Sequence, residues 1–412
     1  MQLVAYGAQD IYLTGNPQIT FFKVVYRRHT NFSMEEIAQT ENGSVILDAT
    51  STPSANYTIS RNGDLVHKMY LQMNIKDLAT SATDAAVPDA IFHNLINDVE
   101  CEIGGQKIDR HYGHWFETWT NLTVQNDRGL RTPYKDGNSG SGIPISEKFS
   151  DNVGAGGMGL SLYDKMTGNA GAKEPMTFDN GEMDYENIHI PLQFWFNRNP
   201  GLALPLIALQ YHEVKIKVSF NSMATATGST VTGYPTGVKL FTQYIYLDTD
   251  ERRRFAQVSH EYLIEQLQYQ NESGTPKNIT LNFNHPVKEL IWTGVGVDNK
   301  IHSPITSNTS WQMKLNGHDR FSTRPLQYFT KQQVYDYHTG FGGLGGSDAI
   351  AVYSFALKPE EHQPSGTCNF SRIDTAQLID TSNNNNVAIN VYAVNYNVLR
   401  IMSGMGGLAY SN

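Results

Sequence analysis

The first candidates for chemistry are two histidines three residues apart, His111 and His114. Imidazole nitrogens are common zinc ligands, and residues three apart on a helix lie on one face. A zinc site needs a third protein ligand, and none is apparent in the neighbouring sequence. Residues 111–122 carry aromatic side chains at helical spacing, which predicts a short helix with its polar residues in solvent and Trp115 in the core.

Three acids precede three arginines in residues 248–254 (DTDERRR). An Asp-x-Asp pair such as Asp248 and Asp250 can hold a divalent metal for phosphoryl transfer. No basic phosphate site or Gly-rich loop accompanies the pair. The sequence therefore favours a surface turn whose charges neutralise one another in salt bridges, within or between subunits. An enzyme that uses these two aspartates is the least favoured alternative.

The glycine-rich run Gly340–Gly346 (GFGGLGG) could be mistaken for a dinucleotide-binding loop. That fingerprint requires a strand before the glycines, a helix after them and an acidic residue further on. Here the run leads directly into Ser347, Asp348 and a segment typical of a strand. The sequence therefore predicts a flexible hairpin at this position, and no cofactor is expected.

Composition excludes several broad classes of protein. The 412 residues carry a net charge of −9, whereas a protein that binds nucleic acid over a broad surface would normally be basic. The longest apolar stretch, residues 201–209, is interrupted by Pro205, and a membrane span needs about 20 residues. Cys101 and Cys368, with no secretory signal in view, indicate a reduced compartment and exclude a Cys-based zinc cage.

Many short segments have the composition of strands. They are rich in β-branched and aromatic residues and are bounded by Gly, Asn or Asp, while helical periodicity is weak. Such a series is typical of an all-β sandwich or barrel with short helices in its loops. The predicted strands are residues 19–28, 45–47, 57–60, 65–75, 98–103, 188–197, 213–220, 240–247, 262–269, 279–283, 289–294, 311–315, 349–357 and 387–396.

A faint internal repeat indicates two domains of one topology. Residues 62–70 resemble 284–292, residues 99–109 resemble 311–319 with Gly105 opposite Gly317, and residues 194–201 resemble 355–366. A Ser/Thr/Gly-rich stretch is the expected linker between the domains. The predicted division is an N-terminal arm 1–20, a first domain 21–220, a linker 221–237, a second domain 238–400 and a tail 401–412.

Longer motifs spread over the whole chain resemble a known family. They are residues 2–31 (QLVAYGAQDIYLTGNPQITFFKVVYRRHTN), 200–214 (PGLALPLIALQYHEV), 255–267 (FAQVSHEYLIEQL), 354–374 (SFALKPEEHQPSGTCNFSRID) and 395–410 (NYNVLRIMSGMGGLAY). In this order they resemble the major capsid proteins of nucleocytoplasmic large DNA viruses, above all those of phycodnaviruses of the chlorella-virus type.

The resemblance implies a double jelly roll, two successive eight-stranded sandwiches. It implies a homotrimer of pseudo-hexagonal outline, which tiles an icosahedral outer shell around a membrane and double-stranded DNA. Its partners would be itself, neighbouring trimers, and minor capsid and penton proteins, with no direct contact to nucleic acid. The membrane would be adjacent without being spanned, and there would be no catalysis. The arm 2–20 and the tail 403–410 are expected at the inner face or the trimer interface.

The resemblance also implies glycans on outward loops, in contexts unlike the cellular triplet. By position, the loop that contains Asn308 and the run from Asn383 to Asn386 correspond to glycan-bearing loops. The triplet Asn-x-Ser/Thr itself arises by chance in an Asn-rich chain, and without a secretory signal it does not imply cellular glycosylation. It occurs at Asn31, Asn42, Asn56, Asn121, Asn271, Asn278, Asn308 and Asn369.

Two alternatives share the jelly-roll fold. A minor capsid or vertex protein usually has one jelly roll or added domains, which the tandem pattern disfavours. A protein that binds host glycans would need exposed aromatic side chains in its loops, and Tyr335, Tyr337 and Phe341 are the candidates. A glycan-binding screen separates this alternative from the capsid protein.

Overall fold

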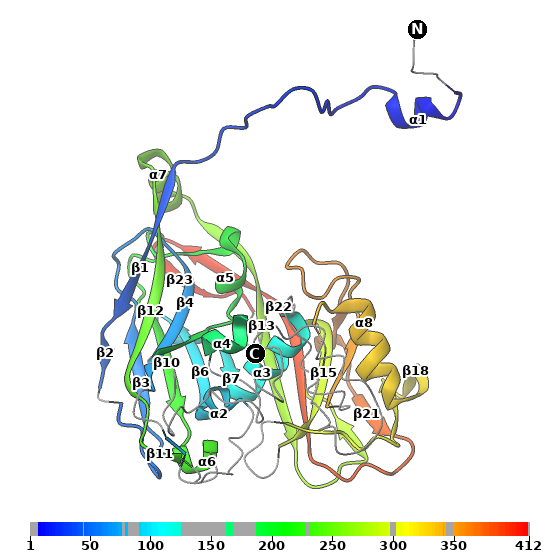
Figure 1. Ribbon diagram of the computed structural model, residues 1–412. Coiled ribbons are helices and arrows are strands. Elements are labelled where there is room, and N and C mark those ends of the chain that lie inside the picture. Colours follow the sequence, from blue (N-terminus) through cyan, green and yellow to red (C-terminus); the bar gives the residue numbers. More distant parts are fainter. Residues whose placement is uncertain are drawn as a thin grey trace, which may run out of the picture.

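The computed structural model describes residues 7–43, 45–75, 79–80, 90–124, 162–167, 187–227, 231–296, 302–340, 342 and 349–410. It contains two antiparallel β-sandwiches side by side, with an N-terminal arm that projects away from one end (Figure 1). Helices are short and lie in the connections between strands. The prediction of an all-β double jelly roll with short helices in its loops is confirmed.

The first sandwich consists of two sheets whose strands are far apart in sequence. Its long strand β4 pairs with β12, which follows it by more than 160 residues, so this sheet is completed only after most of the domain's chain. One sheet has the order β1 (Phe32–Gln39), β12 (Thr236–Leu247), β4 (Leu65–Asn74) and β8 (Asn187–Pro191), with β9 (Leu204–Pro205) beside β4. The other has the order β2 (Glu41–Asn42), β3 (Ser54–Thr58), β10 (Val214–Phe220), β6 (Ile96–Ile103) and β7 (Gln106–Tyr112).

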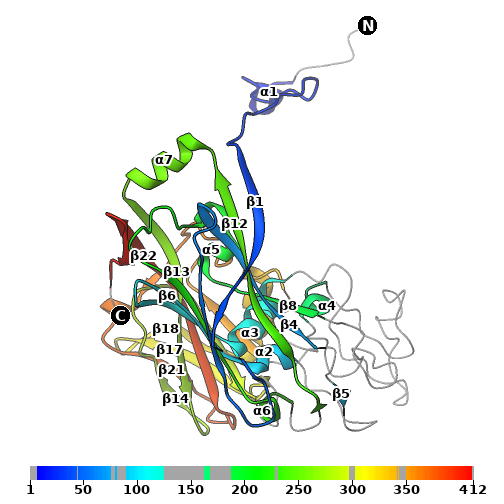
Figure 2. The same cartoon turned by 90° about the vertical axis from the view of Figure 1, so that its left-hand side faces the viewer.

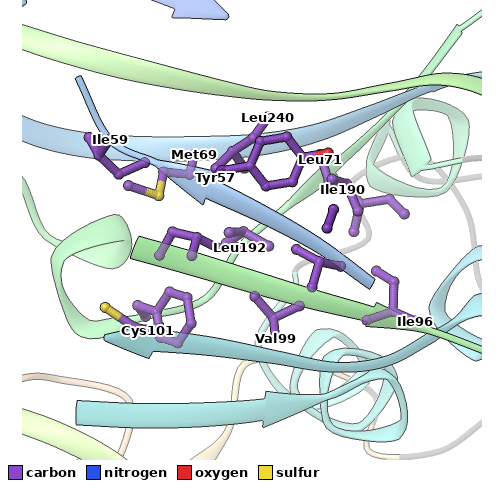
Figure 3. Close-up of a cluster of buried hydrophobic side chains, with 14 of the residues drawn as sticks. Tyr57, Ile59, Met69, Leu71, Ile96, Val99, Cys101, Ile190, Leu192 and Leu240 are labelled. Atoms are coloured by element: carbon purple, nitrogen blue, oxygen red, sulfur yellow. The ribbon is translucent and has the colours of Figure 1, made fainter. Parts of the chain in front are cut away.

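Alternation of side chains builds the core of this sandwich. In β10 the sequence VKIKVSF buries Val214, Ile216 and Val218, while the two lysines between them remain half-exposed. This is the period of two that a strand with one buried face requires. Figure 3 shows the result, with Tyr57 and Leu71 from different sheets in one buried cluster.

The second sandwich has the same plan and its own core around Trp292, Trp311 and Phe329. Its sheets again combine strands from both ends of the domain. One has the order β13 (His260–Glu272), β22 (Ile389–Met402), β15 (Pro286–Val295) and β16 (His302–Ser303), with β19 (Ile350–Ser354), β20 (Cys368–Asn369) and β23 (Met405–Leu408) attached. The other has the order β14 (Asn278–Thr280), β21 (Ala376–Asp380), β17 (Ser310–Leu315) and β18 (His318–Pro325).

The remaining elements are short. A two-stranded sheet joins β5 (Ala79–Thr80) to β11 (Val231–Thr232). The helical segments are α1 (Asp10–Thr14), α2 (Ile91–Leu95), α3 (Gly113–Thr123), α4 (Leu162–Thr167), α5 (Trp195–Arg198), η3 (Pro200–Leu202), α6 (Met223–Thr227), α7 (Thr249–Gln257), η4 (Tyr328–Gln332), α8 (Gln333–Tyr337) and η6 (Phe370–Arg372).

The internal repeat is confirmed for its first two matches. The hairpins β6–β7 and β17–β18 occupy equivalent places, and each turns through two residues of positive φ, Gly104 and Gly105 in one and Asn316 and Gly317 in the other. Two-residue hairpins favour this turn because its twist matches that of the strands. The third match is wrong, because residues 195–198 form the helix α5 rather than a strand.

The predicted linker 221–237 belongs to the first sandwich. Its helix α6 buries Met223 and Ala226 in the first core, and β12 pairs with both β1 and β4. The second domain therefore does not begin at Val238, and the chain crosses between the sandwiches at α7. A stretch rich in Ser, Thr and Gly has the composition of a linker, but the apolar side chains within it are sufficient to dock it.

The predicted strand 19–28 is absent, and the arm extends to residue 31, where β1 follows. Nine large apolar side chains of the arm are at least two-thirds exposed. The pattern has strand composition, but a strand needs a partner, and none lies beside the arm in the described part of the chain. These side chains are Ile11, Tyr12, Leu13, Ile19, Phe21, Phe22, Val24, Val25 and Tyr26. Residues 45–47 also form no strand.

The predicted tail is an integral hairpin rather than a free end. Strand β22 continues to Met402, the chain turns at Ser403 and Gly404 with positive φ, and β23 pairs back onto β22. The hairpin contacts the first sandwich, since the amide of Tyr211 donates to the carbonyl of Gly404 at 3.0 Å. Its role between subunits remains a prediction.

Candidate functional site

Two loops distant in sequence meet at one end of the second sandwich. The side chain of Asn384 donates to the carbonyl of Asn308 at 3.3 Å, and Thr306 Oγ1 donates to Asn386 Oδ1 at 2.5 Å. The amide of Asn386 donates in turn to Thr306 Oγ1 at 3.1 Å. The structure thus brings together the predicted glycan-bearing loops, which are separated by about 75 residues.

Asp380 organises this loop cluster. Its carboxylate accepts from the amide of Ser382 at 3.0 Å and from the amide of Asn385 at 2.8 Å. Burial by itself would raise the pKa of Asp380, but these donors and the Ser382 hydroxyl outweigh burial and lower the pKa below its ordinary value. The turn is therefore held by a carboxylate that remains ionised.

The three predicted glycan-bearing asparagines are accessible, whereas one asparagine of a chance triplet is not. Asn308, Asn383 and Asn386 are all exposed, and Asn383 has a φ of +59°. Among the other Asn-x-Ser/Thr triplets, Asn121 is buried and donates to Glu117 Oε1 at 2.8 Å, so its amide cannot be modified in the folded chain. Asn308 lies in a turn, with its side chain exposed like those of Asn383 and Asn386.

His111 and His114 do not form a metal site. His111 lies on β7, where its Nε2 is 2.9 Å from Asp109 Oδ2, and its ring stacks on Phe194 at 4.6 Å. His114 lies on α3, and its Nδ1 is 2.5 Å from the hydroxyl of Tyr392 in the second sandwich. Burial lowers the pKa of His114 to about 3.

The predicted helix after these histidines is confirmed as α3, but the expectation of solvated polar residues is wrong. Glu117, Thr118 and Asn121 are buried, because α3 lies between the two sandwiches. Within the described residues, no three His, Cys, Asp or Glu side chains are grouped to hold a metal ion.

The acidic and basic cluster begins the helix α7. Asp248 caps it by accepting from the amide of Thr249 at 2.7 Å, and Arg252 Nε is 2.9 Å from Asp64 Oδ1. Asp250 lies in the exposed first turn of the helix, where acidic side chains are favourable. Within the run, Arg254 Nη1 is 3.7 Å from Glu251 Oε1. The predicted neutralising salt bridge is confirmed for this pair, although on a helix rather than a turn.

Sequence reasoning missed the polar core between the sandwiches. The carboxylate of Glu265 contacts Arg198 of the first sandwich, Lys288 Nζ at 2.8 Å and His362 Nδ1 at 3.3 Å. Lys288 has no exposed side-chain surface. Its signal in the sequence was a Lys–Glu pair inside the otherwise apolar run 286–295 (PVKELIWTGV).

Electrostatics in this polar core favour the ionised carboxylate. Burial by itself would raise the pKa of Glu265, but Arg198, His362 and Lys288 outweigh burial and lower the pKa well below its ordinary value. Burial lowers the pKa of Lys288, an effect that Glu265 opposes. A cavity of about 490 Å³ opens beside Arg198, Glu265 and His362. Every charge faces an opposite one, which is the pattern of a structural network rather than of a reactive centre.

A second buried group surrounds His338. Its Nε2 is 3.1 Å from Glu289 Oε2, and its Nδ1 is 3.1 Å from Glu360 Oε1. Burial would lower the pKa of His338, but the two carboxylates outweigh burial and raise it to about 9. An imidazolium between two carboxylates therefore links three segments of the second sandwich.

Comparisons with known proteins give the family. A family model described as "Major capsid protein N-terminus" matches residues 20–248, and one described as "Large eukaryotic DNA virus major capsid protein" matches residues 251–407. Curated major capsid proteins of Pyramimonas orientalis virus and Paramecium bursaria Chlorella virus 1 are 48% and 40% identical, over 100% of this chain and 99% of each relative. The chain belongs to the family of large eukaryotic DNA virus major capsid proteins.

Solved structures agree with this assignment. A quasi-atomic model of the PBCV-1 virus capsid has 37% sequence identity and a TM-score of 0.70, covering 95% of this chain and 100% of that one. The Faustovirus major capsid protein has 12% identity and a TM-score of 0.69, over 96% of this chain and 94% of that one, and shows the shared fold alone. As a capsid protein, the chain is a structural component of the virion outer shell.

The glycine-rich run of this capsid protein has a local packing role where it is described. The amide of Gly340 donates to the carbonyl of Leu122 at 2.7 Å, and Gly342 donates to Asn121 at 2.9 Å. A Cβ on Gly340 would lie 2.4 Å from the carbonyl oxygen of Asn121, so this approach requires glycine. Residues 343–348 lie outside the described residues.

The aromatic residues that the glycan-binding alternative requires are only partly in place. Tyr335 of the capsid protein is 87% exposed, Tyr337 is half-buried, and Phe341 lies outside the described residues. Cys101 is buried and Cys368 half-buried, and neither forms a disulfide. No helix in the described ranges is long and apolar enough to cross a bilayer.

Proposed function

We propose that three copies of this chain form one capsomer, and that these trimers tile the viral shell. The observation that carries the proposal is the tandem repeat. Each chain contributes two sandwiches of the same strand order, so a threefold arrangement presents six similar units around one axis. Six units of one plan give a nearly hexagonal outline, which can pack against its neighbours in a flat layer.

The arm is the second observation in favour of self-association. Figures 1 and 2 both show it extending beyond the body, and a monomer gains nothing from nine exposed large apolar side chains. We place the arm at the inner face or between subunits. Deletion of residues 1–20 should leave the folded body intact and impair shell assembly. Normal shells from the truncated chain would contradict this placement.

Other partners follow from the same proposal. Neighbouring trimers, minor capsid proteins and penton proteins would contact the outer surfaces of the capsomer. The net charge of −9 supports a role without direct nucleic-acid contact. The viral membrane would be an adjacent layer. Catalysis is not part of the proposed role, since Asp248 caps α7, His111 pairs with Asp109, and His114 contacts Tyr392. Asp250 lies exposed in the first turn of α7, where an acidic side chain is favourable.

The glycan proposal concerns the loop cluster. We assign Asn308 as the first candidate for modification, with Asn383 and Asn386 as further candidates, because all three are exposed on adjoining loops. Intact-mass measurement of protein from virions should show added hexose mass, which Asn308→Gln removes if Asn308 carries the glycan. Virion protein without added hexose would contradict the proposal.

The trimer itself is tested by light scattering after size exclusion. The expected mass is about 138 kDa, three times the 46.0 kDa of one chain, and it should persist on dilution. A stable mass near 46.0 kDa would mean that the chain alone does not form the capsomer.

A further inference from the structure

The two sandwiches of one chain are joined by a defined contact. On β7, the carbonyl of Ile108 accepts from Gln266 of β13, and Asp109 Oδ1 accepts from the amide of Leu267 at 3.0 Å. Tyr112 at the end of β7 packs on Tyr269 of β13 at 4.6 Å. The last strand of one sheet thus lies on the first strand of the other domain.

The helix that follows β7 continues this contact. Trp115, Trp119 and Leu122 of α3 pack with Ile291 and Tyr392 on the sheet of the second sandwich. The chain therefore contains one complete example of how one jelly roll covers the flank of the next.

Equivalent elements occur a second time, as largely exposed strands at the edges of their sheets. The equivalent of β7 in the second sandwich is β18, and the equivalent of β13 in the first sandwich is β1, because each takes the same place in its sheet order. Seven of the eight residues of β18 are exposed and none is buried. In β1, six of eight are exposed and only Gln39 is buried. Figure 1 shows these two edges on opposite sides of the molecule.

Registers make the equivalence specific to individual residues. Both hairpins have a bulge at the same distance from the turn. Asp109 pairs with Cys101 in the first hairpin, and Phe321 pairs with Met313 at the equivalent position in the second. The bulged residue before each is Ile108 and Arg320, so these two residues also correspond.

On the opposite edge, the repeat aligns Tyr70 with Trp292. Cross-strand pairing then aligns Ala38 with Gln270. Four residues earlier along these strands, Met34 corresponds to Gln266 and Glu35 to Leu267.

We propose that β18 of one copy docks on β1 of the next copy, in the same way that β7 docks on β13 within the chain. This interface rests on the proposed trimer and specifies which edges form it. Ile108 contacts Gln266 within the chain, and their equivalents are Arg320 and Met34. The proposed interface therefore places Arg320 of one copy beside Met34 and Glu35 of the next. Arg324, further along β18, then lies near Glu36. A head-to-tail contact of this kind closes into a ring of three when the rotation that relates one subunit to the next is one third of a full turn.

Charge supports this pairing of edges. On a chain of net charge −9, β18 carries Arg320, Arg324 and His318, and its one acid, Asp319, lies 3.8 Å from Lys314. The strand β1 carries Glu35 and Glu36. Within the described residues, neither Arg320 nor Glu36 has an ion-pair partner closer than 4 Å. Opposite charges across an interface favour correct encounter and register.

The surface beside β18 has room for a neighbour. A cavity of about 570 Å³ is open along Arg324, Tyr328 and Tyr335. The edge β1 in turn exposes Phe32 by 52% and Met34 by 54%. Aromatic and Arg side chains on one side and apolar side chains on the other are typical of the core of an interface.

Charge reversal tests the proposal on the full chain. Glu35→Arg with Glu36→Arg, or Arg320→Glu with Arg324→Glu, should each convert the trimer to a species near 46.0 kDa in light scattering. All four substitutions in one chain should restore the trimer, because the pairs then face each other with reversed sign. A matched control exchanges the exposed Glu213 and the half-exposed Lys215, 3.4 Å apart on another surface, and should remain trimeric.

The outcomes separate the two proposals. If the unaltered chain is a trimer and both reversed variants remain trimers, the edge pairing is overturned while the capsomer stands. If the fourfold variant fails to recover the trimer although thermal unfolding shows it folded, the pairing of these particular charges is overturned. If the unaltered chain is a stable monomer, the trimer and the edge pairing are both overturned.

Discussion

In each sandwich a helix follows the outermost strand of one sheet, α3 after β7 and η4–α8 after β18. The helix α3 is buried between the two domains, whereas η4–α8 has an exposed face. In the first sandwich, α3 presents Trp115, Trp119 and Leu122 to the other domain and buries them.

In the second sandwich, the η4–α8 helix buries Phe329 and Val334 on one face and exposes Tyr335 on the other. Tyr328 is half-buried beside Arg324. The same architectural position therefore has two chemistries. An interface that forms as the chain folds tolerates large apolar side chains, whereas one that forms later between folded subunits must stay soluble until then.

The largest effect is expected at the buried helix α3. Trp119→Ala removes a ring that stacks on Trp115 at 5.4 Å and lies under the Arg198 guanidinium at 5.0 Å. The free energy of unfolding should fall by about 3–5 kcal/mol, as for other buried Trp truncations. Urea or thermal denaturation measures it. A change below about 1 kcal/mol would mean that the junction between sandwiches contributes little to stability.

The polar core of the same junction should be nearly as sensitive, but asymmetrically. Glu265→Leu leaves Arg198 and Lys288 without their shared carboxylate, and should cost about 3–5 kcal/mol. Lys288→Met leaves Glu265 with Arg198 and His362, and should cost much less. Denaturation of the two variants side by side checks this order, and a larger cost for Lys288→Met would contradict it.

A pH dependence follows from His338, which the covered junction does not include. Its pKa rises from 6.5 to about 9 on folding, so the folded state holds a proton that the unfolded chain releases earlier. This stabilisation is fully present below pH 6.5 and is lost as the pH rises through about 9. At about 1.4 kcal/mol for each pKa unit, the total is of order 3 kcal/mol. Denaturation midpoints from pH 6 to 10 measure the slope, which His338→Gln should flatten.

The smallest effect on stability is expected at the exposed face of the η4–α8 helix. Tyr335→Ala removes a side chain that is 87% exposed, so the free energy of unfolding should change by less than about 0.5 kcal/mol. Together with Trp119→Ala it forms a matched pair on equivalent helices. Equal losses of unfolding free energy for the two variants would contradict the distinction between the buried and the exposed helix.

Much of the fold was predictable because strands with one buried face have a clear pattern. Residues 65–75, 213–220 and 311–315 all appear as strands within one or two residues of the expected bounds. The repeat aligned Gly105 with Gly317, and both residues take positive φ in equivalent hairpin turns. The predicted strand 19–28 was wrong for the opposite reason, because these residues have strand composition but no adjacent strand among the described residues.

The candidate sites show where local pattern stops being informative. Asn308 and the run to Asn386 were named separately, and only the folded chain shows that they adjoin through Thr306. His111 and His114 looked like a pair but belong to different environments, since one lies in the first core and the other against Tyr392.

By itself, the sequence determined the class, the tandem plan and the family, because side-chain alternation, turn residues and long motifs are local properties of the chain. The tertiary structure alone decided that β12 closes the first sandwich and that α3 is buried between domains. It also decided that Glu265 contacts Arg198, and that β18 and β1 are largely exposed strands at sheet edges. Those facts depend on contacts between residues tens to hundreds of positions apart, which no local pattern encodes.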